Sequence, residues 1–172
     1  GFSVAAHQLG KCWRDGMGVL PDDEQAELWF RRAAEAGHDF SQYALGKLLQ
    51  SQKRMEEAVS WYEKAAAQGN PYAAYRLGKL YLEGKDVPKD VAKAVEYLTN
   101  AAQEGNQYAQ YTLGKLYLTG EDVTQDREQA YRWFWESASQ GNEYAQFFLD
   151  HFNDNRSPNV LLSATKLLHH MG

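Results

Sequence analysis

The sequence is poor in the features that build cross-linked or membrane-anchored proteins. Its 172 residues include four prolines and one cysteine, Cys12. A single cysteine excludes an internal disulfide and a cysteine-rich zinc site, and it permits a reducing compartment. No apolar run approaches the roughly 20 residues of a transmembrane helix. No secretory signal peptide is visible in a chain that begins at Gly1 rather than Met. These absences favour a cytoplasmic location.

Positive charge is also scarce. The chain has 18 basic and 23 acidic residues, a formal net charge of −5. A broad nucleic-acid surface needs clustered positive charge, so this balance argues against direct nucleic-acid binding. Hydrophobic residues make up 44% of the chain and aromatic residues 13%, which excludes a disordered polymer. The composition therefore predicts a folded, acidic protein without a membrane partner.

The chain repeats itself. The segment AAYRLGKLYLEG, which begins at Ala73, returns almost unchanged as AQYTLGKLYLTG from Ala109. A Leu-Gly pair marks each copy, with Leu-Asp in the last, and these pairs begin at Leu9, Leu45, Leu77, Leu113 and Leu149. The steps between them are 36, 32, 36 and 36 residues, and each step holds two helical patterns and two turns. Such a period predicts an array of helix-turn-helix units rather than one conventional core.

The turn and cap signals place the boundaries of this array. We expect a single repeat domain over 1–172, with repeats at about 3–37, 38–69, 70–105 and 106–141, a fifth first helix at 142–152 and a capping helix at 157–170. Asn and Ser before a helix, and Pro at its first position, support these starts. Glycines recur in mid-helix, at Gly78 and Gly114, where each costs about 0.5–1 kcal/mol relative to alanine. We expect a neighbouring helix to approach closely there.

Apolar periodicity predicts which faces are buried. In the first helix, Ala5, Leu9 and Trp13 share one face. In the second helices, the predicted core stripe includes Trp29, Trp61, Tyr97 and Trp133. In the capping helix, the stripe that should cover the last repeat consists of Val160, Ala164, Leu167 and Met171. Leu161 and Leu162 then lie exposed, where they offer a dimer contact.

The recurring pattern A-x-x-x-L-G-x-x-Y-x-x-G, followed by V-x-x-D-x-x-x-A-x-x-W-x-x-x-A-A-x-x-G-N, resembles the Sel1-like repeat of the tetratricopeptide superfamily. The resemblance covers roughly Val4 to Leu149. It implies an all-α, right-handed α-solenoid that serves mainly as an adaptor for other proteins. The second repeat departs from the pattern because it lacks the long turn between its helices, and it looks more like a plain tetratricopeptide unit.

In tetratricopeptide-like arrays, the first helix of each repeat lines a concave groove, and this resemblance implies a ligand face here. Positions two before and two after each Leu-Gly leucine lie opposite the core stripe. The predicted peptide-binding residues in these two rows are His7, Lys11, Tyr43, Lys47, Tyr75, Lys79, Tyr111, Lys115, Phe147 and His151. A third row, five before the leucine, consists of Val4, Phe40, Tyr72, Tyr108 and Tyr144.

Aromatic residues beside lysines suit an acidic peptide or an amphipathic helix with acidic flanks. We therefore expect a non-enzymatic scaffold that binds a peptide or helix of another protein. The alternative is that these rows only pack neighbouring repeats together. The oligomeric state stays open.

Nothing in the sequence predicts catalysis, a cofactor or a metal site. Cys12 has no evident base beside it. His169 and His170 are adjacent, so on a helix they point about 100° apart and do not readily share a metal. The Gly16–Gly18 stretch follows no strand, which excludes a phosphate-binding loop. Some Sel1-like proteins were considered hydrolytic, but those are rich in cysteine.

The C-terminal region carries a second resemblance. The segment AQFFLD from Ala145, followed by the segment from Ser157 to Met171, is similar to the ends of certain mobilisation relaxases from Gram-positive gut bacteria. No nicking motif is present. This resemblance implies an alternative role as the accessory C-terminal domain of a relaxase in conjugative transfer.

Overall fold

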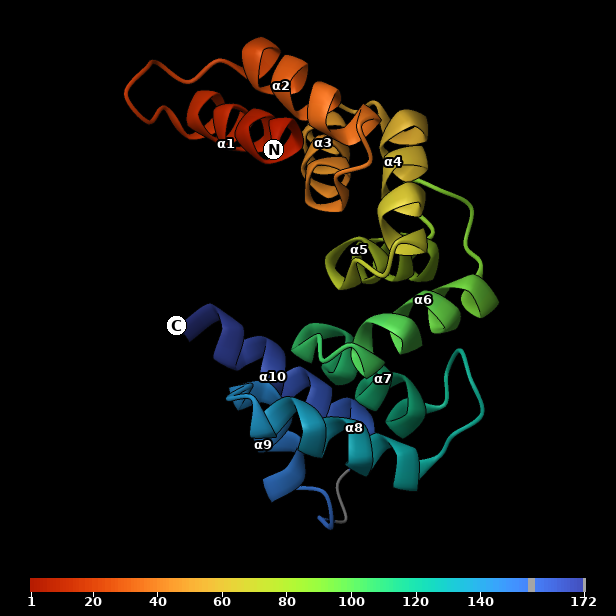
Figure 1. Cartoon of the computed structure of the whole chain (residues 1–172). Helices are drawn as coiled ribbons and strands as arrows, with labels where there is room; N and C mark the ends of the chain where they lie inside the picture. Colours follow the sequence, from red (N-terminus) through yellow and green to blue (C-terminus); the bar gives the residue numbers. More distant parts are fainter. Residues whose placement is uncertain (155–156, 172) are drawn as a thin grey trace. The chain divides into compact units, whose positions relative to one another are not determined.

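The fold is known from a computed structural model, which describes residues 1–154 and 157–171, with side chains up to residue 167 (Figure 1). The expected all-α solenoid of helix-turn-helix repeats is confirmed: the described residues form ten helices and no strand. The chain separates into two compact units, Gly1–Lys89 and Asp90–Gly172. Their boundary falls between the two helices of the third repeat.

The first unit holds two complete repeats and the first helix of the third. Its helices are α1 (Phe2–Asp15), α2 (Asp23–Glu35), α3 (Asp39–Ser51), α4 (Met55–Ala67) and α5 (Pro71–Glu83). Each of α2, α3 and α4 packs against the helices before and after it in the chain. The odd-numbered helices are the first helices of their repeats.

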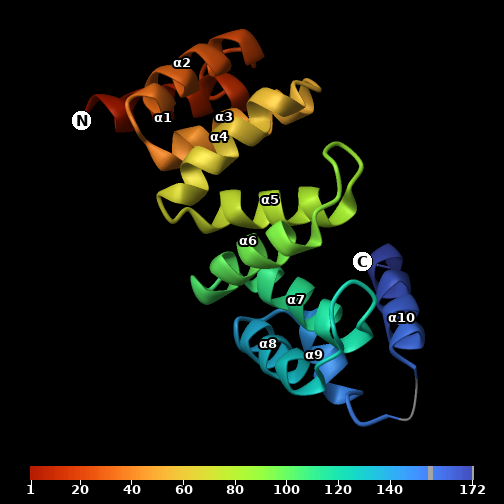
Figure 2. The ribbon, with the colours of Figure 1, turned by 90° about the vertical axis from the view of Figure 1, so that its right-hand side faces the viewer.

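The second unit begins with the second helix of the third repeat. Its helices are α6 (Val91–Gln103), α7 (Gln107–Thr119), α8 (Arg127–Ser139), α9 (Glu143–Asp150) and α10 (Pro158–Met171). The helices α6 to α9 pack in chain order, and α10 returns to contact α7 and α9 (Figure 2).

Asparagine fixes the start of three first helices. The side chains of Asn70, Asn106 and Asn142 accept hydrogen bonds from backbone N–H groups three residues later, at 2.9–3.0 Å. Each follows a glycine with a positive φ between 88° and 93°, a conformation that glycine adopts at little cost. A cap of this kind stabilises a helix by about 0.5–2 kcal/mol. These Gly-Asn pairs therefore set the start of each repeat.

The expected close approach is confirmed at Gly114 and is also seen at Gly10 and Gly46, whereas the approach expected at Gly78 stays a prediction. A Cβ atom added to Gly10, Gly46 or Gly114 would lie 2.6–2.7 Å from an aromatic ring carbon of the second helix. Those rings are the fully buried Phe30, Tyr62 and Phe134. The glycines leave room for a ring between the two helices, so close packing explains their recurrence.

The predicted core stripe of the second helices is only partly correct. Trp61 is buried, but Trp29, Tyr97 and Trp133 are half-buried. The fully buried residue is the next one along the chain, and these residues are Phe30, Tyr62, Leu98 and Phe134. The tryptophans lie at the edge of the stripe, where the side chain of Trp29 stacks with Arg32 and that of Trp61 with Lys64.

The prediction for α1 is also wrong in register. Leu9 is 40% exposed and Ala5 is exposed, whereas Ala6 and Gly10 are buried. The corresponding Leu45, Leu77 and Leu113 are fully buried. The leucine side chain is buried where a second helix precedes the first helix, as α2 precedes α3, whereas α1 is the first helix described.

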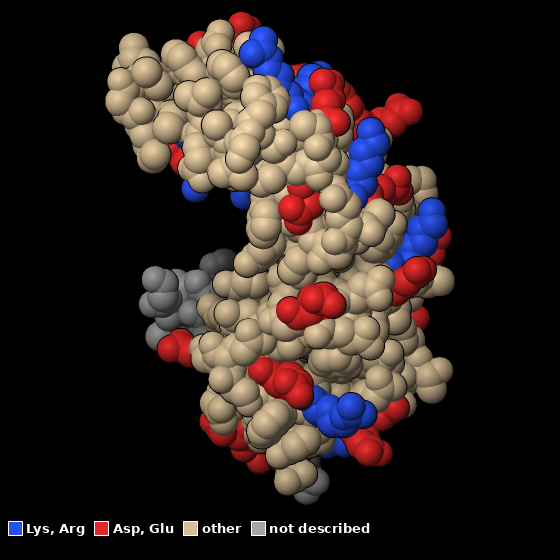
Figure 3. All heavy atoms as spheres, viewed as in Figure 1, with Lys and Arg blue, Asp and Glu red and all other residues tan. Residues whose placement is uncertain are grey.

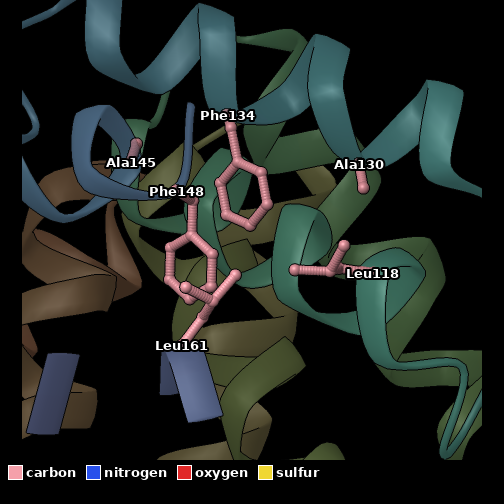
Figure 4. Close-up of a cluster of buried hydrophobic side chains, with 6 residues drawn as sticks. All are labelled: Leu118, Ala130, Phe134, Ala145, Phe148 and Leu161. Carbon is pink, nitrogen blue, oxygen red and sulfur yellow. The ribbon is translucent and has the colours of Figure 1, made fainter. Parts of the chain in front are cut away.

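The predicted buried face of α10 is wrong. Val160 and Leu167 are 51% and 65% exposed, whereas Leu161 and Thr165 are 4% and 3% exposed. Leu161 joins a buried cluster with Leu118, Ala130, Phe134, Ala145 and Phe148 (Figure 4). The side chain of Met171, the last residue of the predicted stripe, lies outside the described residues. The helix therefore uses a neighbouring face, because it lies on first helices rather than over the end of the array.

Candidate functional site

Ring and hydrogen-bond contacts bring the first helices together in each unit. In the first unit, His7 of α1 contacts Ser41 of α3, and Tyr43 of α3 contacts Tyr72 of α5. In the second unit, Tyr111 of α7 contacts Tyr144 of α9. We call the surface formed by these helices the first-helix face of each unit. The two faces together carry the ten predicted binding residues.

Tyr43 lies at the centre of the face in the first unit. Its ring centroid is 6.1 Å from that of Tyr62 and 5.8 Å from that of Tyr72, and the Lys47 Nζ lies 5.6 Å from its centroid. Tyr43 is half-buried, whereas Phe40 and Tyr72 are each 48% exposed. The residues of the third predicted row therefore present more open aromatic surface than Tyr43 does.

Two arginines, not anticipated by the sequence as neighbours of Lys47, act on its charge. Burial, and then the positive charges of Arg76 and Arg14, lower the pKa of the Lys47 ammonium. We call Arg14, Lys47 and Arg76 the cationic cluster. Arg14 forms two hydrogen bonds with the Asp15 carboxylate, at 2.7 and 2.9 Å. The helical spacing already placed Arg14 three residues after Lys11, and Arg76 three residues before Lys79.

His7 belongs to the contact between α1 and α3. Its Nδ1 is 2.8 Å from the Ser41 hydroxyl, and its ring lies 5.0 Å from that of His38. Burial, followed by the charges of His38, Lys11 and Arg14, lowers the pKa of His7 to about 4. The imidazole is therefore neutral at pH 7 and serves packing more than recognition of an acidic group.

The other predicted residues of the first unit differ in their surroundings. Lys11 and Tyr75 are half-buried. Lys79 Nζ lies 3.3 Å from the Glu83 carboxylate, one turn later in the same helix. A partner's acid must compete with Glu83 at Lys79, whereas Lys47 forms no ion pair with any described residue.

In the second unit, the predicted residues lie together but are packed more tightly. Tyr111 contacts the rings of Phe134, Tyr144 and Phe148 at 6.0–6.1 Å, and Lys115 Nζ lies 4.5 Å from its centroid. Burial raises the pKa of Tyr111.

At α9, the ring of Phe147 lies 4.3 Å from that of His151. The Nδ1 of His151 is 2.8 Å from the backbone oxygen of Phe147. Both residues are half-buried.

Part of this second face is occupied by α10. The Thr165 side chain acts on Tyr111 and lowers its pKa, which burial raises, and Leu161 packs on Phe148 and Phe134. Sequence reasoning missed this contact because the exposed and buried stripes of α10 are both apolar. The two first-helix faces therefore differ: α10 contacts the second, and the cationic cluster lies on the first.

Charges on the second helices have a different arrangement. Arg31 and Arg54 form ion pairs with Glu27 and Glu57 at 2.8–3.0 Å, which join α2 to the start of α4. Figure 3 shows basic and acidic side chains interspersed along these helices. Paired charges of this kind support packing between repeats and leave little net charge for a partner.

Two features that would mark other functions are missing from the described residues. They contain no group of three histidine, cysteine or acidic side chains placed to hold a metal. None of their helices is long and apolar enough to cross a membrane. A cavity of about 390 Å³ lies in the second unit and includes Arg132, Glu136 and Gln140, none of which is a predicted site residue.

The helix pairs and their Leu-Gly pattern match a known repeat model. The Sel1 repeat matches residues 3–38, 40–70, 71–106 and 107–142. The chain belongs to the Sel1 repeat family. Proteins built from Sel1 repeats are generally non-catalytic scaffolds for protein–protein interaction. No curated protein matches the chain.

Solved structures with this fold are similar over most of the chain. A Sel1 repeat protein from Oxalobacter formigenes is 30% identical, with a TM-score of 0.80 over 86% of this chain and 62% of its own. A protective antigen from uropathogenic Escherichia coli is 33% identical, with a TM-score of 0.81 over 91% of this chain and 35% of its own. An immunity protein from Pseudomonas aeruginosa is 27% identical, with a TM-score of 0.61 over 93% of this chain and 61% of its own.

The chain thus spans less than two thirds of the length of these Sel1 repeat structures. None of the three is described as a relaxase. The relaxase role inferred from the C-terminal resemblance remains a prediction.

Proposed function

We propose that this Sel1 repeat protein is a non-enzymatic scaffold that binds a peptide or helix of another protein on the first-helix face of its first unit. Tyr43, Lys47, Tyr75 and Lys79 are the contact residues. The observation that carries this proposal is the cluster of exposed Phe40 and Tyr72 beside Tyr43 and the unpaired Lys47. Aromatic rings provide large, rigid contact area, and a lysine at their edge selects partners with acidic groups.

The corresponding residues of the second unit contribute less to this function. Tyr111 and Phe147 pack against the cluster that holds α10. Lys115, which lies on the Tyr111 ring, and His151, which lies beside Phe147, remain candidates for peripheral contacts. We place the main binding surface on α3 and α5.

A comparison of two double variants tests the proposal. Proteins captured from a lysate by the wild-type chain are identified, purified and titrated against Tyr43→Ala/Lys47→Glu. The control, Lys64→Glu/Trp135→Ala, alters one lysine and one aromatic residue on second helices, where Trp135 is 54% exposed. We expect the dissociation constant to rise at least tenfold in the first variant and to stay within twofold in the control. Equal affinity of the two variants for the partner would rule out the first-helix face as the binding surface.

A further inference from the structure

The second unit already contains a helix bound to its first-helix face. Leu161 of α10 packs among Leu118 of α7, Phe134 of α8 and Phe148 of α9. One turn later, the buried Thr165 side chain lies near enough to Tyr111 to lower the pKa that burial raises. This arrangement shows what kind of segment the face accepts: a helix that inserts one side chain between consecutive first helices and places a polar side chain near the central tyrosine.

The first unit has the same arrangement of aromatic residues. Tyr43 lies 6.1 Å from Tyr62, as Tyr111 lies 6.1 Å from Phe134. At the neighbouring first helix, Tyr43–Tyr72 and Tyr111–Tyr144 are 5.8 and 6.1 Å apart. A lysine ammonium, Lys47 or Lys115, lies on each central tyrosine ring. The two faces therefore have matching positions for a bound helix.

The side chains around the inserted residue differ between the two faces. Counting from the Leu-Gly leucines, Leu118 corresponds to Gln50 and Phe148 to Arg76, while Phe134 and Tyr62 both lie on a first-helix glycine. Where Leu161 has apolar surroundings in the second unit, the first unit has the amide of Gln50, the phenol of Tyr62 and the guanidinium of Arg76. The Tyr62 hydroxyl donates a hydrogen bond of 2.7 Å to the Gln50 side chain.

Charge complementarity identifies the side chain that such surroundings select. Arg76 and Lys47 form no ion pair with any described carboxylate. By repeat register Arg76 holds the position of Phe148, and Lys47 lies on the Tyr43 ring as Lys115 lies on that of Tyr111. Arg76 also acts on the Tyr62 phenol, whose pKa is raised mainly by burial. Two neighbouring cations repel each other until an anion lies between them, and arginine binds a carboxylate through two parallel hydrogen bonds.

We propose that the first-helix face of the first unit binds a helix of a partner protein in the manner of α10, with an aspartate or glutamate side chain at the position that Leu161 occupies in the second unit. The carboxylate pairs with Arg76 and Lys47, and the neighbouring apolar side chains of the ligand helix cover Tyr43 and Tyr72. This inference rests on the proposed function and specifies the partner as an acidic amphipathic helix.

Two peptides made from the α10 sequence serve as probes. One is residues 157–171 unchanged, and the other carries Leu161→Glu; both have a fluorescent label at the N-terminus. Their binding to the full-length chain is measured by anisotropy at low salt and at high salt. We expect the peptide with Leu161→Glu to bind at least tenfold more tightly than the unchanged peptide at low salt, and the difference to shrink at high salt because salt screens the charge pair.

Matched variants of the protein locate the site. Arg76→Gln and Lys47→Gln should each abolish most of the preference for the acidic peptide, whereas Lys64→Gln, at an exposed lysine on a second helix, should leave it unchanged. Equal binding of the two peptides, no binding of either, or a preference that survives Arg76→Gln would each overturn the proposed carboxylate site.

The outcomes also separate this inference from the scaffold function. If a natural partner loses affinity in Tyr43→Ala/Lys47→Glu but not in Arg76→Gln, and the acidic peptide has no advantage, the scaffold role stands without the carboxylate. If that double variant has no effect on the partner, the scaffold role itself fails on this face.

Discussion

The rings of Phe134 and Phe148 lie parallel, with an interplanar angle of 1° and centroids 4.7 Å apart. Phe134 comes from the second helix of the fourth repeat and Phe148 from the following first helix, and Leu161 of α10 packs in the same cluster (Figure 4). The stack and Leu161 together therefore link three helices of the second unit, α8, α9 and α10. It turns the end of the array into a site that holds a helix.

Leu161→Ala should destabilise the second unit by about 2–5 kcal/mol, because it leaves a cavity in a buried cluster. The matched variant Leu167→Ala should cost less than about 0.5 kcal/mol, since Leu167 is 65% exposed on the same helix. Urea unfolding measures the stability, and hydrogen exchange of the α10 amides reports its detachment. A larger effect at Leu167 than at Leu161 would contradict the observed face.

Gly114→Ala should lower the free energy of unfolding by about 1–3 kcal/mol through overpacking, partly offset by the better helix propensity of alanine. The added Cβ would lie 2.7 Å from the Phe134 ring. The second substitution Phe134→Leu should reduce this cost, because Leu98 already fills the corresponding position of the third repeat. Thermal unfolding of Gly114→Ala, of Gly114→Ala/Phe134→Leu and of Phe134→Leu alone measures these costs. A stability in Gly114→Ala equal to that of the wild type would show that the ring moves freely.

Acid should destabilise the first unit through His7. Its pKa is about 4 in the folded chain and 6.5 for the ordinary side chain, so the unfolded state binds more protons between these values. Stability that is present above pH 6.5 is therefore lost as the pH falls towards 4, below which this contribution levels off. We expect His7→Gln to show a shallower loss of the urea midpoint over this range. A nuclear magnetic resonance titration that gives His7 a pKa near 6.5 would refute the explanation.

The ion pairs between α2 and α4 should contribute little to the free energy of unfolding. Glu27 and Arg54 lie 2.9 Å apart with partly exposed side chains, and exposed pairs typically contribute about 0.2–1 kcal/mol. A double-mutant cycle with Glu27→Gln and Arg54→Met should give a coupling energy in this range at low salt. The coupling should decrease in 1 M salt, where the screening length falls to about 3 Å. Coupling that is independent of salt would indicate a contact shielded from water.

Particular residues show where sequence reasoning succeeds. The spacing of the Leu-Gly pairs predicted the paired helices, and Asn70 and Asn106 cap them as expected. The glycines of the first helices predicted a close approach, and Gly114 lies against Phe134. These features depend on contacts within one repeat or between adjacent repeats, so a local pattern is enough to encode them.

The candidate site was less predictable. The sequence placed Tyr43 and Lys47 on one face but gave no means to exclude His7, which the structure assigns to a packing contact with Ser41. Arg76 was missed because it stands alone at its position among the repeats. Its role in the proposed site depends on Lys47 and Tyr62, which come from other helices and on whose pKa values Arg76 acts.

The sequence by itself determined the repeat period, the helix pairs and the family, because each depends on side chains within a few turns of one another. Only the tertiary structure decided which of two apolar stripes of α10 is buried. Both Leu161 and Leu167 are suitable for burial, and the choice depends on the surface formed by Leu118, Phe134 and Phe148 of three other helices. The same long-range packing left the two first-helix faces different, one holding α10 and the other carrying the cationic cluster.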